Sequence, residues 1–532
     1  MFIKSKGFTL IELLAVIVIL AIIAVIATPI ITGIIEDTKK ESFKRSAEGV
    51  VEATKFDIAD KMTDSGYTYT LSDGKIANLN ENVKISNSKG MNGSIKYNKD
   101  GEVSYAIYND KWCVIKEGND VTLSNNIDKC VIVNPYKEEI LNGTYPVLDE
   151  KMIAITYTEA GIPKVADESS EWYSYASRKW ANAVVLVNNP SKTYNVGDEI
   201  EESDIAAYFV WIPRYEYTLK GNFGVNGESK TNPGYVDIRF TNVSEESNGT
   251  ASYTEGNPTN YRTQDAFKFG EENLSGIWVG KFETTGTADN PTIKPGITSL
   301  RSQNVSTQFE TAKKIGINNS LSLETSMMKN SEWNAVAILS QSIYGRCPSD
   351  STCPEVALNN NTNFITGSAT AGSTYNSEEG VKASTTMNIT GVYDMNGGAA
   401  EWVMGVLLDS DGKPRSGYNI SNNSGFNGKL QDGTEKTDGL ALPESKYYDS
   451  FTITGENTKV DLMTGCNDGK CYGTVEFGGW YNDYTMSIVP AYPWLLRGGA
   501  CSNGASAGLW VFGGDGGSAV EVLSVRAVIR GA

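Results

Sequence analysis

The sequence contains no histidine among its 532 residues. Histidine is the commonest general base near neutral pH and a frequent metal ligand, so its absence removes Ser-His and Cys-His catalysis and histidine-ligated metal sites. Basic residues are also in the minority, because 46 lysines and arginines stand against 64 aspartates and glutamates, a formal net charge of −18. A chain without an excess of basic residues has no surface for releasing counterions from phosphates, so we expect no nucleic-acid partner.

The seven cysteines include no CxxC spacing, and no histidine is present to complete a mixed zinc site. Six of them form three local pairs, Cys113 with Cys130, Cys347 with Cys353, and Cys466 with Cys471, and Cys501 stands alone. This spacing favours three disulfides in an oxidising compartment outside the membrane. Six unrelated buried thiols are the alternative, because connectivity does not follow from sequence.

The N-terminal region has the pattern of a membrane-spanning segment. Lys4 and Lys6 precede an apolar run from Phe8 to Ile35, which as a helix rising about 1.5 Å per residue is long enough to cross a bilayer core of about 30 Å. A secretory signal peptide has its small-residue cleavage site after the apolar run, whereas Gly7 stands before it. We therefore expect the apolar segment to survive processing, and a plain signal anchor is the alternative.

This stretch resembles the leader of type IV prepilins and pseudopilins. The resemblance implies that prepilin peptidase cuts after Gly7, that Phe8 becomes the N-methylated first residue, and that Pro29 loosens the helix. It also implies that Glu12 pairs with the N-terminal amine of a neighbouring pilin subunit, and an unpaired carboxylate inside a membrane costs about 2.5–3.5 kcal/mol or more. The expected partners are the peptidase, other pilin subunits in a filament and the inner membrane during biogenesis; the expected location is the cell membrane before assembly, then an extracellular pilus or the cell surface.

The segment after Ile35 becomes amphipathic, which predicts that the helix continues across a globular head. The predicted inner face contains Phe43, Ala47, Val50, Val51, Ala53 and Phe56. Residues 65–135 alternate apolar and polar in short runs broken by Gly, Asn and Asp, which predicts a small antiparallel sheet held by Cys113 and Cys130.

Residues 141–203 are rich in aromatic side chains, and we interpret them as a short connecting β module. Four of these side chains are candidates for stacking on a sugar, although aromatic residues more often form core: Trp172, Tyr173, Tyr175 and Trp180. From Asp204 the sequence changes to short strands in long polar loops, with helical patterns only over 305–316 and 326–344.

Over roughly Asp204–Arg530 the motifs resemble the formylglycine-generating enzyme or sulfatase-modifying-factor family, a variant of the C-type lectin fold. The matching stretches are "YFVWIPRYEYTL", "WVGKFETT", "SEWNAVAILS", "YDMNGGAAEWV", "LRGGACSN" and "SVRAVI". Enzymatic members bind copper through two closely spaced cysteines, whereas Cys501 has no such partner in sequence. Ala399, Ala400, Ser502 and Val525 depart from the family pattern.

The segment from Ala500 to Ser524 shows neither strand alternation nor a helical period. It resembles the variable region of diversity-generating retroelement target proteins, which share the lectin-like fold and in which Asn codons ending in C are mutated at adenines. The resemblance implies the following ligand-binding variable positions: Ala500, Cys501, Ser502, Ser506, Val511, Gly513, Gly514, Asp515, Ser518, Ala519, Val520 and Val522. It implies a fixed scaffold at Asn503, Gly504, Ala507 and Gly508. Such codons cannot encode Trp510 and Glu521, so these positions are excluded or need another template codon. We expect Trp402, Trp480 and Trp510 to flank this surface; a static Gly-rich closing loop is the alternative.

No cofactor is expected, with calcium at "LLDSDGKPRSG" as a weak candidate through Asp409 and Asp411. The further ligands of an EF-hand are missing there, so a solvated Asp-Gly turn is the ordinary interpretation.

The sequence therefore predicts an α+β chain: leader 1–7, membrane and pilin spine helix 8–64, β head 65–140, β-rich connector 141–203, and a C-type lectin-like binding domain 204–532 with its variable region at 497–526. The predicted function is surface display of a non-enzymatic domain for adhesion or recognition of an unknown protein or glycan. The alternatives are a surface-tethered modifying enzyme of the formylglycine-generating type, which would bind copper through Cys501, and a pseudopilin of a secretion system.

Overall fold

The structure is a computed structural model that describes residues 10–58, 61, 67–76, 79–80, 83–97, 103–117, 120–125, 127, 130, 142–220, 234–247, 261–347, 353–408, 423–426, 441–452, 479–486 and 488–531. For some residues inside helices and strands, 21–35 among them, it describes the backbone alone. The chain divides into two compact units, Met1–Pro135 and Tyr136–Ala532, and each is described by itself.

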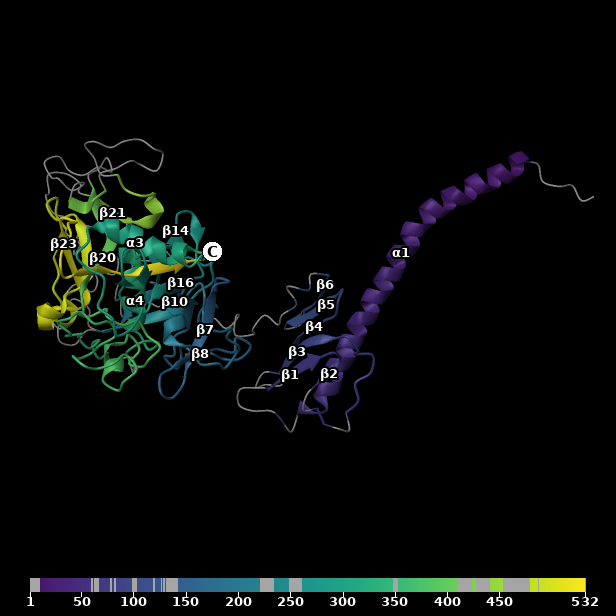
Figure 1. Cartoon of the computed structure of the whole chain (residues 1–532), viewed down its shortest axis with the longest axis horizontal. Helices are drawn as coiled ribbons and strands as arrows, with labels where there is room; N and C mark the ends of the chain where they lie inside the picture. The colour runs from purple at the N-terminus through teal and green to yellow at the C-terminus, as the bar shows by residue number, and fades with distance from the viewer. Residues whose placement is uncertain are drawn as a thin grey trace, which may run out of the picture. The chain divides into compact units, whose positions relative to one another are not determined.

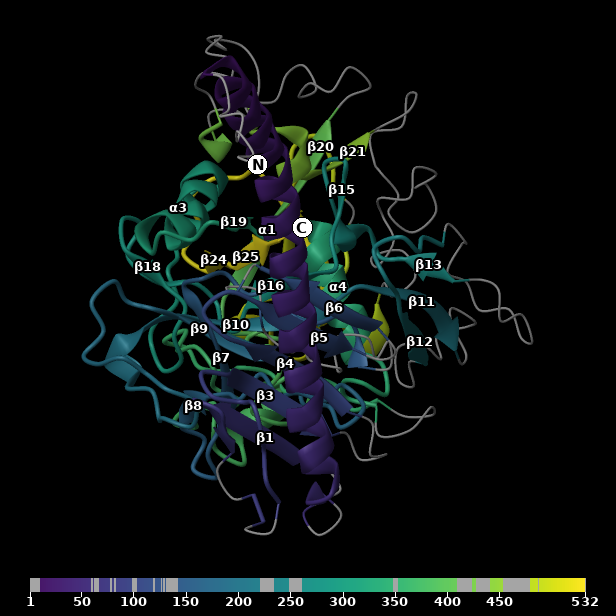
Figure 2. The ribbon, with the colours of Figure 1, turned by 90° about the vertical axis from the view of Figure 1, so that its right-hand side faces the viewer.

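The first unit is one long helix packed on a sheet (Figures 1 and 2). Helix α1 (Leu10–Lys55) runs across the face of a six-stranded antiparallel sheet with the order β2-β1-β3-β4-β5-β6. The strands are β1 (Tyr67–Ser72), β2 (Lys75–Ile76), β3 (Asn92–Tyr97), β4 (Val103–Tyr108), β5 (Cys113–Glu117) and β6 (Asp120–Ser124). The antiparallel sheet predicted over 65–135 is therefore present.

The inner face of α1 is the one that the sequence predicts, with one exception. Phe43, Ala47 and Val50 are buried against the sheet, because residues four and three positions apart share a helix face. Phe56 is 83% exposed, so its assignment to this face is wrong. It follows the last residue of α1, Lys55, where the helical period no longer places it.

The described apolar side chains at the start of α1 have no cover within the unit. More than half of each of Leu10, Ile11 and Leu14 is exposed, where the helix extends beyond the sheet (Figure 1). In the part of the chain that the structure describes, no helix is long and apolar enough to cross a membrane.

The second unit is built around a seven-stranded antiparallel sheet with the order β19-β25-β16-β10-β9-β7-β8. Its strands are β7 (Met152–Tyr157), β8 (Pro163–Val165), β9 (Asn182–Leu186), β10 (Ile205–Pro213), β16 (Gly276–Gly280), β19 (Glu324–Met327) and β25 (Ala527–Arg530). Every residue of the central strand β10 is buried, which explains its unbroken apolar sequence. Because β7 to β9 belong to this sheet, residues 141–203 are part of the second unit and not a separate connector.

Smaller sheets complete this unit. A three-stranded sheet contains β11 (Tyr215–Lys220), β12 (Tyr235–Phe240) and β13 (Arg262–Thr263). Two hairpins follow, β14 (Lys268–Phe269) with β15 (Glu272–Asn273), and β17 (Thr285–Gly286) with β18 (Pro291–Thr292). A five-stranded sheet contains β20 (Ala400–Leu408), β21 (Asp449–Thr452), β22 (Trp494–Gly498), β23 (Gly508–Asp515) and β24 (Leu523–Val525).

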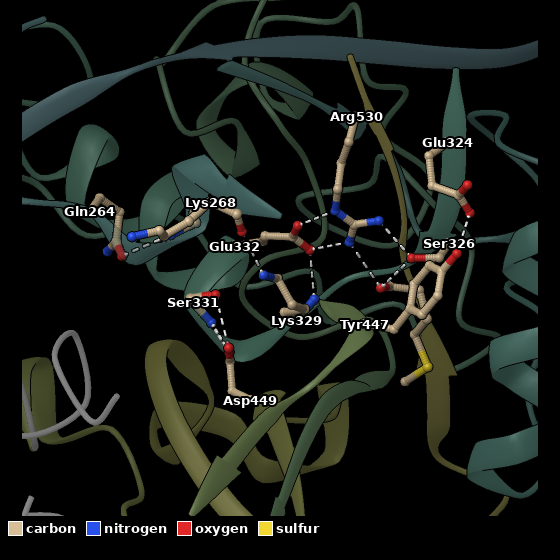
Figure 3. Close-up of polar contacts among 12 residues, drawn as sticks. Gln264, Lys268, Glu324, Ser326, Lys329, Ser331, Glu332, Tyr447, Asp449 and Arg530 are labelled. Carbon is tan, nitrogen blue, oxygen red and sulfur yellow. Dashed lines mark hydrogen bonds and ion pairs between the residues drawn. The ribbon is translucent and has the colours of Figure 1, made fainter. Parts of the chain in front are cut away.

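The two predicted helical segments are present as α3 (Val305–Asn318) and α4 (Asn330–Ser340). Helix α4 is tied to the last strand by a buried ion pair (Figure 3). Glu332 of α4 accepts hydrogen bonds from Nε and Nη2 of Arg530 at 2.5 and 2.7 Å, and from the Lys329 N–H at 2.7 Å. Burial opposes the charge on Glu332, but the Arg530 guanidinium holds the pKa of that carboxyl below its usual range.

Candidate functional site

The predicted variable segment begins at the end of β22 and contains a turn, a short 3-10 helix, β23, the loop 516–522 and β24. Gly498 and Gly499 have φ of 78° and 70°, a left-handed conformation that glycine adopts without strain. The 3-10 helix η10 (Cys501–Ser506) follows, and then β23 pairs antiparallel with β22. The sequence shows no alternation over β23 because its first six residues are all buried.

Positions predicted as fixed scaffold have structural reasons to be fixed. Asn503 Oδ1 accepts a hydrogen bond from the Ala500 N–H at 2.7 Å, which closes the turn into η10. Gly504 has φ 55° and ψ −130°, a conformation essentially restricted to glycine. A Cβ at Gly508 would lie 2.0 Å from Oδ1 of Asp483, so no larger residue fits. Ala507 is buried as well.

The twelve predicted variable positions divide into three groups by exposure. The exposed group is Ser502, Ser506, Ser518 and Ala519, the half-buried group is Gly514, Asp515, Val520 and Val522, and the buried group is Ala500, Cys501, Val511 and Gly513. We call the first four residues the exposed face. The buried group cannot contact a ligand without rearrangement, so the surface available for contact is smaller than the sequence predicts.

Gly514 is also poorly suited to be a variable position. A Cβ at this position would lie 2.5 Å from the carbonyl oxygen of Tyr492, so a side chain requires the backbone to move. At Gly513 the nearest atom to such a Cβ belongs to the flexible Leu496 side chain at 3.3 Å, which leaves room for a small residue after a slight shift.

The tryptophans expected to flank this surface do not lie on it. Trp402 and Trp480 are fully buried and Trp510 is 1% exposed, because their indoles fill the core beneath β20 and β23. Two tyrosines that no sequence motif indicates are exposed instead, Tyr484 at 52% and Tyr492 at 51%. The Tyr484 N–H donates to the Ser506 carbonyl at 3.0 Å, which places this residue beside the exposed face.

Cys501 is a buried free thiol at the start of η10. Its backbone N–H donates to the Gly398 carbonyl at 2.9 Å. Burial raises the pKa of the thiol, the charge of Glu283 raises it further, and Arg301 lowers it in part. A raised pKa leaves little thiolate at neutral pH, which is the opposite of what a nucleophilic cysteine needs.

A buried arginine joins the sheet that carries the site to the central sheet. Arg526, between β24 and β25, donates from Nη2 to Oε1 of Glu401 at 2.5 Å and from Nε to Oε2 at 3.1 Å. Its Nη1 donates to the Gly280 carbonyl on β16 at 2.8 Å. Burial raises the pKa of Glu401 to about 7 although the Arg526 charge opposes this. Both residues therefore act as scaffold.

Two further buried ionisable groups, Arg497 of β22 and Asp483, lie beside β23. Arg497 Nη1 donates to Oδ1 of Asn330 at 2.9 Å, and burial lowers the pKa of this guanidinium to about 9. Asp483 Oδ2 accepts from the Trp510 N–H at 2.8 Å. Burial raises the pKa of Asp483 to about 8, and the charge of Glu355 adds to this effect.

Some of the remaining predicted residues lie within the described part of the chain and others do not. Disulfides join Cys113 to Cys130 and Cys347 to Cys353, which confirms two predicted pairs. Outside the described residues lie Gly7, Phe8, Asp409, Asp411, Cys466 and Cys471. Glu12 and Pro29 lie on α1, where only the backbone is described. Over the described ranges, no cluster of three Cys, Asp or Glu side chains is arranged to hold a metal ion.

Comparison with known proteins gives two findings. Residues 3–28 match the prokaryotic N-terminal methylation motif. The chain is similar to a solved structure, the Major Tropism Determinant I1 Variant, with 10% sequence identity, a TM-score of 0.26, and coverage of 80% of this chain and 81% of that chain. No curated protein matches the sequence.

Proposed function

We propose that the protein is a type IV pilin-like surface subunit that displays a ligand-binding domain for adhesion or recognition. The observation that carries this proposal is the N-terminal methylation motif over residues 3–28, which overlaps the start of the long helix α1 that packs on the antiparallel sheet. A methylation motif implies processing by a prepilin peptidase and export toward the surface.

The exposed apolar start of α1 supports assembly. Leu10, Ile11 and Leu14 are 60% or more exposed, and an uncovered apolar helix in water is unfavourable by about 25 cal/mol per Å². Neighbouring subunits or lipid would cover these side chains. Packing into a filament therefore explains why the apolar start of α1 is not buried within its own subunit.

The side chains of the exposed face make no hydrogen bonds that hold the fold, and this supports ligand binding by residues that can be replaced. Within the described residues, the side chains of Ser502, Ser506 and Ser518 make no hydrogen bond. The path of η10 depends instead on backbone contacts, such as Cys501 N–H to Gly398 O, and on Asn503. Substitutions at the exposed face leave these contacts in place, so a rigid scaffold can carry different recognition surfaces.

The N-terminal part of the proposal is tested by mass spectrometry of the full chain produced together with a prepilin peptidase. The expected product begins at Phe8 and carries one methyl group, and replacement of Gly7 by Val blocks the cut. Recovery of surface-exposed protein that retains its first seven residues contradicts the proposal.

The binding part is tested by replacing Ser502, Ser506, Ser518 and Ala519 together with Lys. Filament-bearing cells are scored for adhesion to a panel of unrelated bacterial and animal cells. We expect adhesion to change while the melting temperature stays within about 2 °C, since exposed substitutions alter stability by about 0.5 kcal/mol or less each. The matched control replaces Ala160, Ala176, Ser244 and Ala371 together with Lys, because these four residues are exposed in the same unit and the substitutions add the same charge. Unchanged adhesion, or a control that changes it equally, contradicts the assignment.

A further inference from the structure

Two tyrosine side chains differ from the other aromatic side chains of the second unit by their exposure. Tyr484 is 52% exposed and Tyr492 is 51% exposed, whereas the other described aromatic side chains of this unit are buried or half-buried. Tyrosine is enriched in contact surfaces, because it offers a large, rigid area at a small cost in conformational entropy. These two residues are therefore candidates for contact with a partner, and Tyr484 is the one beside the exposed face.

The backbone of Tyr484 is held by the two elements that carry the predicted variable positions. Its N–H donates to the Ser506 carbonyl of η10 at 3.0 Å, and its carbonyl accepts from the Phe512 N–H of β23 at 3.2 Å. The Met486 N–H donates in turn to the Phe512 carbonyl at 3.0 Å. The ring of Tyr484 is thus attached to a backbone that is positioned before any partner arrives.

The ring of Tyr484 lies beside a position of β23 that has no side chain. A Cβ at Gly513 would lie 3.8 Å from Cε1 of Tyr484 and 3.3 Å from Cδ1 of Leu496. The Tyr484 hydroxyl donates to Sδ of Met486 at 3.3 Å, and both Leu496 and Met486 are half-buried. Tyr484, Met486 and Leu496 therefore form a small apolar surface around Gly513, which we call the Tyr484 platform.

A carboxylate lies on the same face of β23 as the platform. Side chains two residues apart in a strand point to the same side and are separated by about 7 Å, so Asp515 shares the face of Gly513. Asp515 is half-buried, and its Oδ1 accepts from the Gly517 N–H at 3.1 Å, which leaves Oδ2 for a partner. A cation within about 6 Å of the Tyr484 ring centre is attracted by that ring and is also in the range of this carboxylate.

The charged side chains accessible on this part of the surface are all acidic. Over the described residues 479–486 and 488–526, both arginines are buried, Arg497 and Arg526, while Asp515 is half-buried and Glu521 is exposed. Arg301 reaches this stretch from outside, but its guanidinium donates to the Glu521 carbonyl. The charge of the surface therefore favours a cationic group of the partner and disfavours an anionic one.

We propose, on the basis of the proposed binding function, that Tyr484 and Asp515 together take an arginine side chain of a partner protein. The planar guanidinium stacks on the Tyr484 ring and donates to the Asp515 carboxylate, a combination that suits arginine better than the compact, strongly hydrated ammonium of lysine. The partner is accordingly a protein, because glycans contain no guanidinium. Tyr484 lies outside the predicted variable positions and Asp515 is one of them, so the ring is a constant anchor and the carboxylate sets the preference for a cation.

The test uses beads that display a defined peptide to cells bearing the full chain. One set of beads carries Gly-Gly-Arg-Gly-Gly, and two further sets carry lysine or glutamine in the place of arginine. We expect arginine beads to bind about two- to fivefold better than lysine beads, the factor that one cation–π contact at an exposed site supplies. The lysine beads have the same charge, so they account for nonspecific attraction to an acidic chain, and the glutamine beads give the background.

Substitutions assign the preference to the two residues. Tyr484→Leu lowers the binding of arginine beads to the level of lysine beads, whereas Tyr484→Phe keeps the ring and the preference. Tyr492→Leu is the matched control, because Tyr492 is equally exposed but contacts the neighbouring position Gly514, whose side-chain direction is the opposite face of β23; it leaves the preference unchanged. Asp515→Asn lowers the binding of arginine beads, and Glu521→Gln, which removes the same charge, lowers it less.

The outcomes separate this inference from the wider proposal. The inference is overturned if arginine beads bind no better than lysine beads, or if Tyr484→Leu and Tyr492→Leu have equal effects. A preference for arginine that depends on Tyr484, in cells whose adhesion is unaffected by the four lysine substitutions at the exposed face, supports this site and contradicts only the assignment of the exposed face. The melting temperature of Tyr484→Leu stays within about 2 °C of the unaltered chain, because the hydrogen bonds that hold this segment come from its backbone.

Discussion

Asp483 makes the stability of the second unit depend on pH in a calculable way. Burial raises the pKa of its carboxyl to about 8 from an ordinary value of 3.8, and its Oδ1 has no hydrogen-bond partner among the described residues. At neutral pH the folded protein therefore holds a proton on Asp483 that the unfolded chain releases. The stabilisation that this proton gives the folded state is fully present below pH 3.8 and is lost as pH rises to about 8.

The magnitude follows from the difference of one proton between the two states. Each pH unit between these limits lowers the free energy of unfolding by about 1.4 kcal/mol for a single such group. Asp483→Asn removes this dependence and keeps an oxygen that can accept from the Trp510 N–H. The variant should lose about 1.4 kcal/mol per pH unit from the wild-type slope between pH 5.5 and 7.5, and it should be the more stable protein at pH 8.

The assay is urea unfolding of the full chain from pH 5.5 to 8.5, followed by tryptophan fluorescence. Trp112 is the one tryptophan outside the second unit, so the signal reports mainly on that unit. Asp204→Asn provides a control without a slope in this pH range, because hydrogen bonds from Ser191 and Tyr194 lower the pKa of Asp204 below its ordinary value of 3.8, and its contribution is lost only at lower pH. An Asp483→Asn slope equal to the wild-type slope, or lower stability at pH 8, would refute the reasoning.

Three other substitutions have clear expected outcomes. Arg526→Met leaves the buried carboxyl of Glu401 without its guanidinium partner, and we expect a loss of about 3–5 kcal/mol in urea unfolding. Cys113→Ser opens the disulfide to Cys130, whose 17-residue separation predicts a loss of about 3 kcal/mol in the first unit, measured by hydrogen exchange of its sheet. Phe56→Ser removes a side chain that is 83% exposed, and the melting temperature should change by less than the equivalent of about 0.5 kcal/mol.

The first unit was predictable because local rules decide it. The spacing of Phe43, Ala47 and Val50 identifies one face of a helix, and the short alternating runs identify strands, of which β3 to β6 each pair with the next strand in sequence. The local pair of Cys113 and Cys130 is likewise bonded as its spacing suggests. The error at Phe56 lies at the end of the helix, where periodicity alone gives no boundary.

The site in the second unit was only partly predictable, because its burial depends on contacts between distant segments. Trp402 and Trp510 belong to a layer that β20 and β23 complete from positions more than 100 residues apart in the sequence. Nothing local distinguishes such buried indoles from exposed ones, and nothing local shows that Tyr484 and Tyr492 are exposed. The glycines were more informative, since Gly504 and Gly508 each occupy a place that no other residue fits.

The placement of Arg526 explains how a surface of the second unit can vary while the unit stays folded. The residue lies between β24, which pairs with β20, and β25, which is held between β16 and β19. Its hydrogen bonds to Glu401 of β20 and to the Gly280 carbonyl of β16 therefore join the two sheets four residues after Val522. Because these contacts involve no side chain of the exposed face, replacing Ser502 or Ser518 removes none of them. On the proposed function, in which the exposed face binds the ligand, stability and recognition depend on different residues of one short segment, so the two should vary independently in substitution experiments.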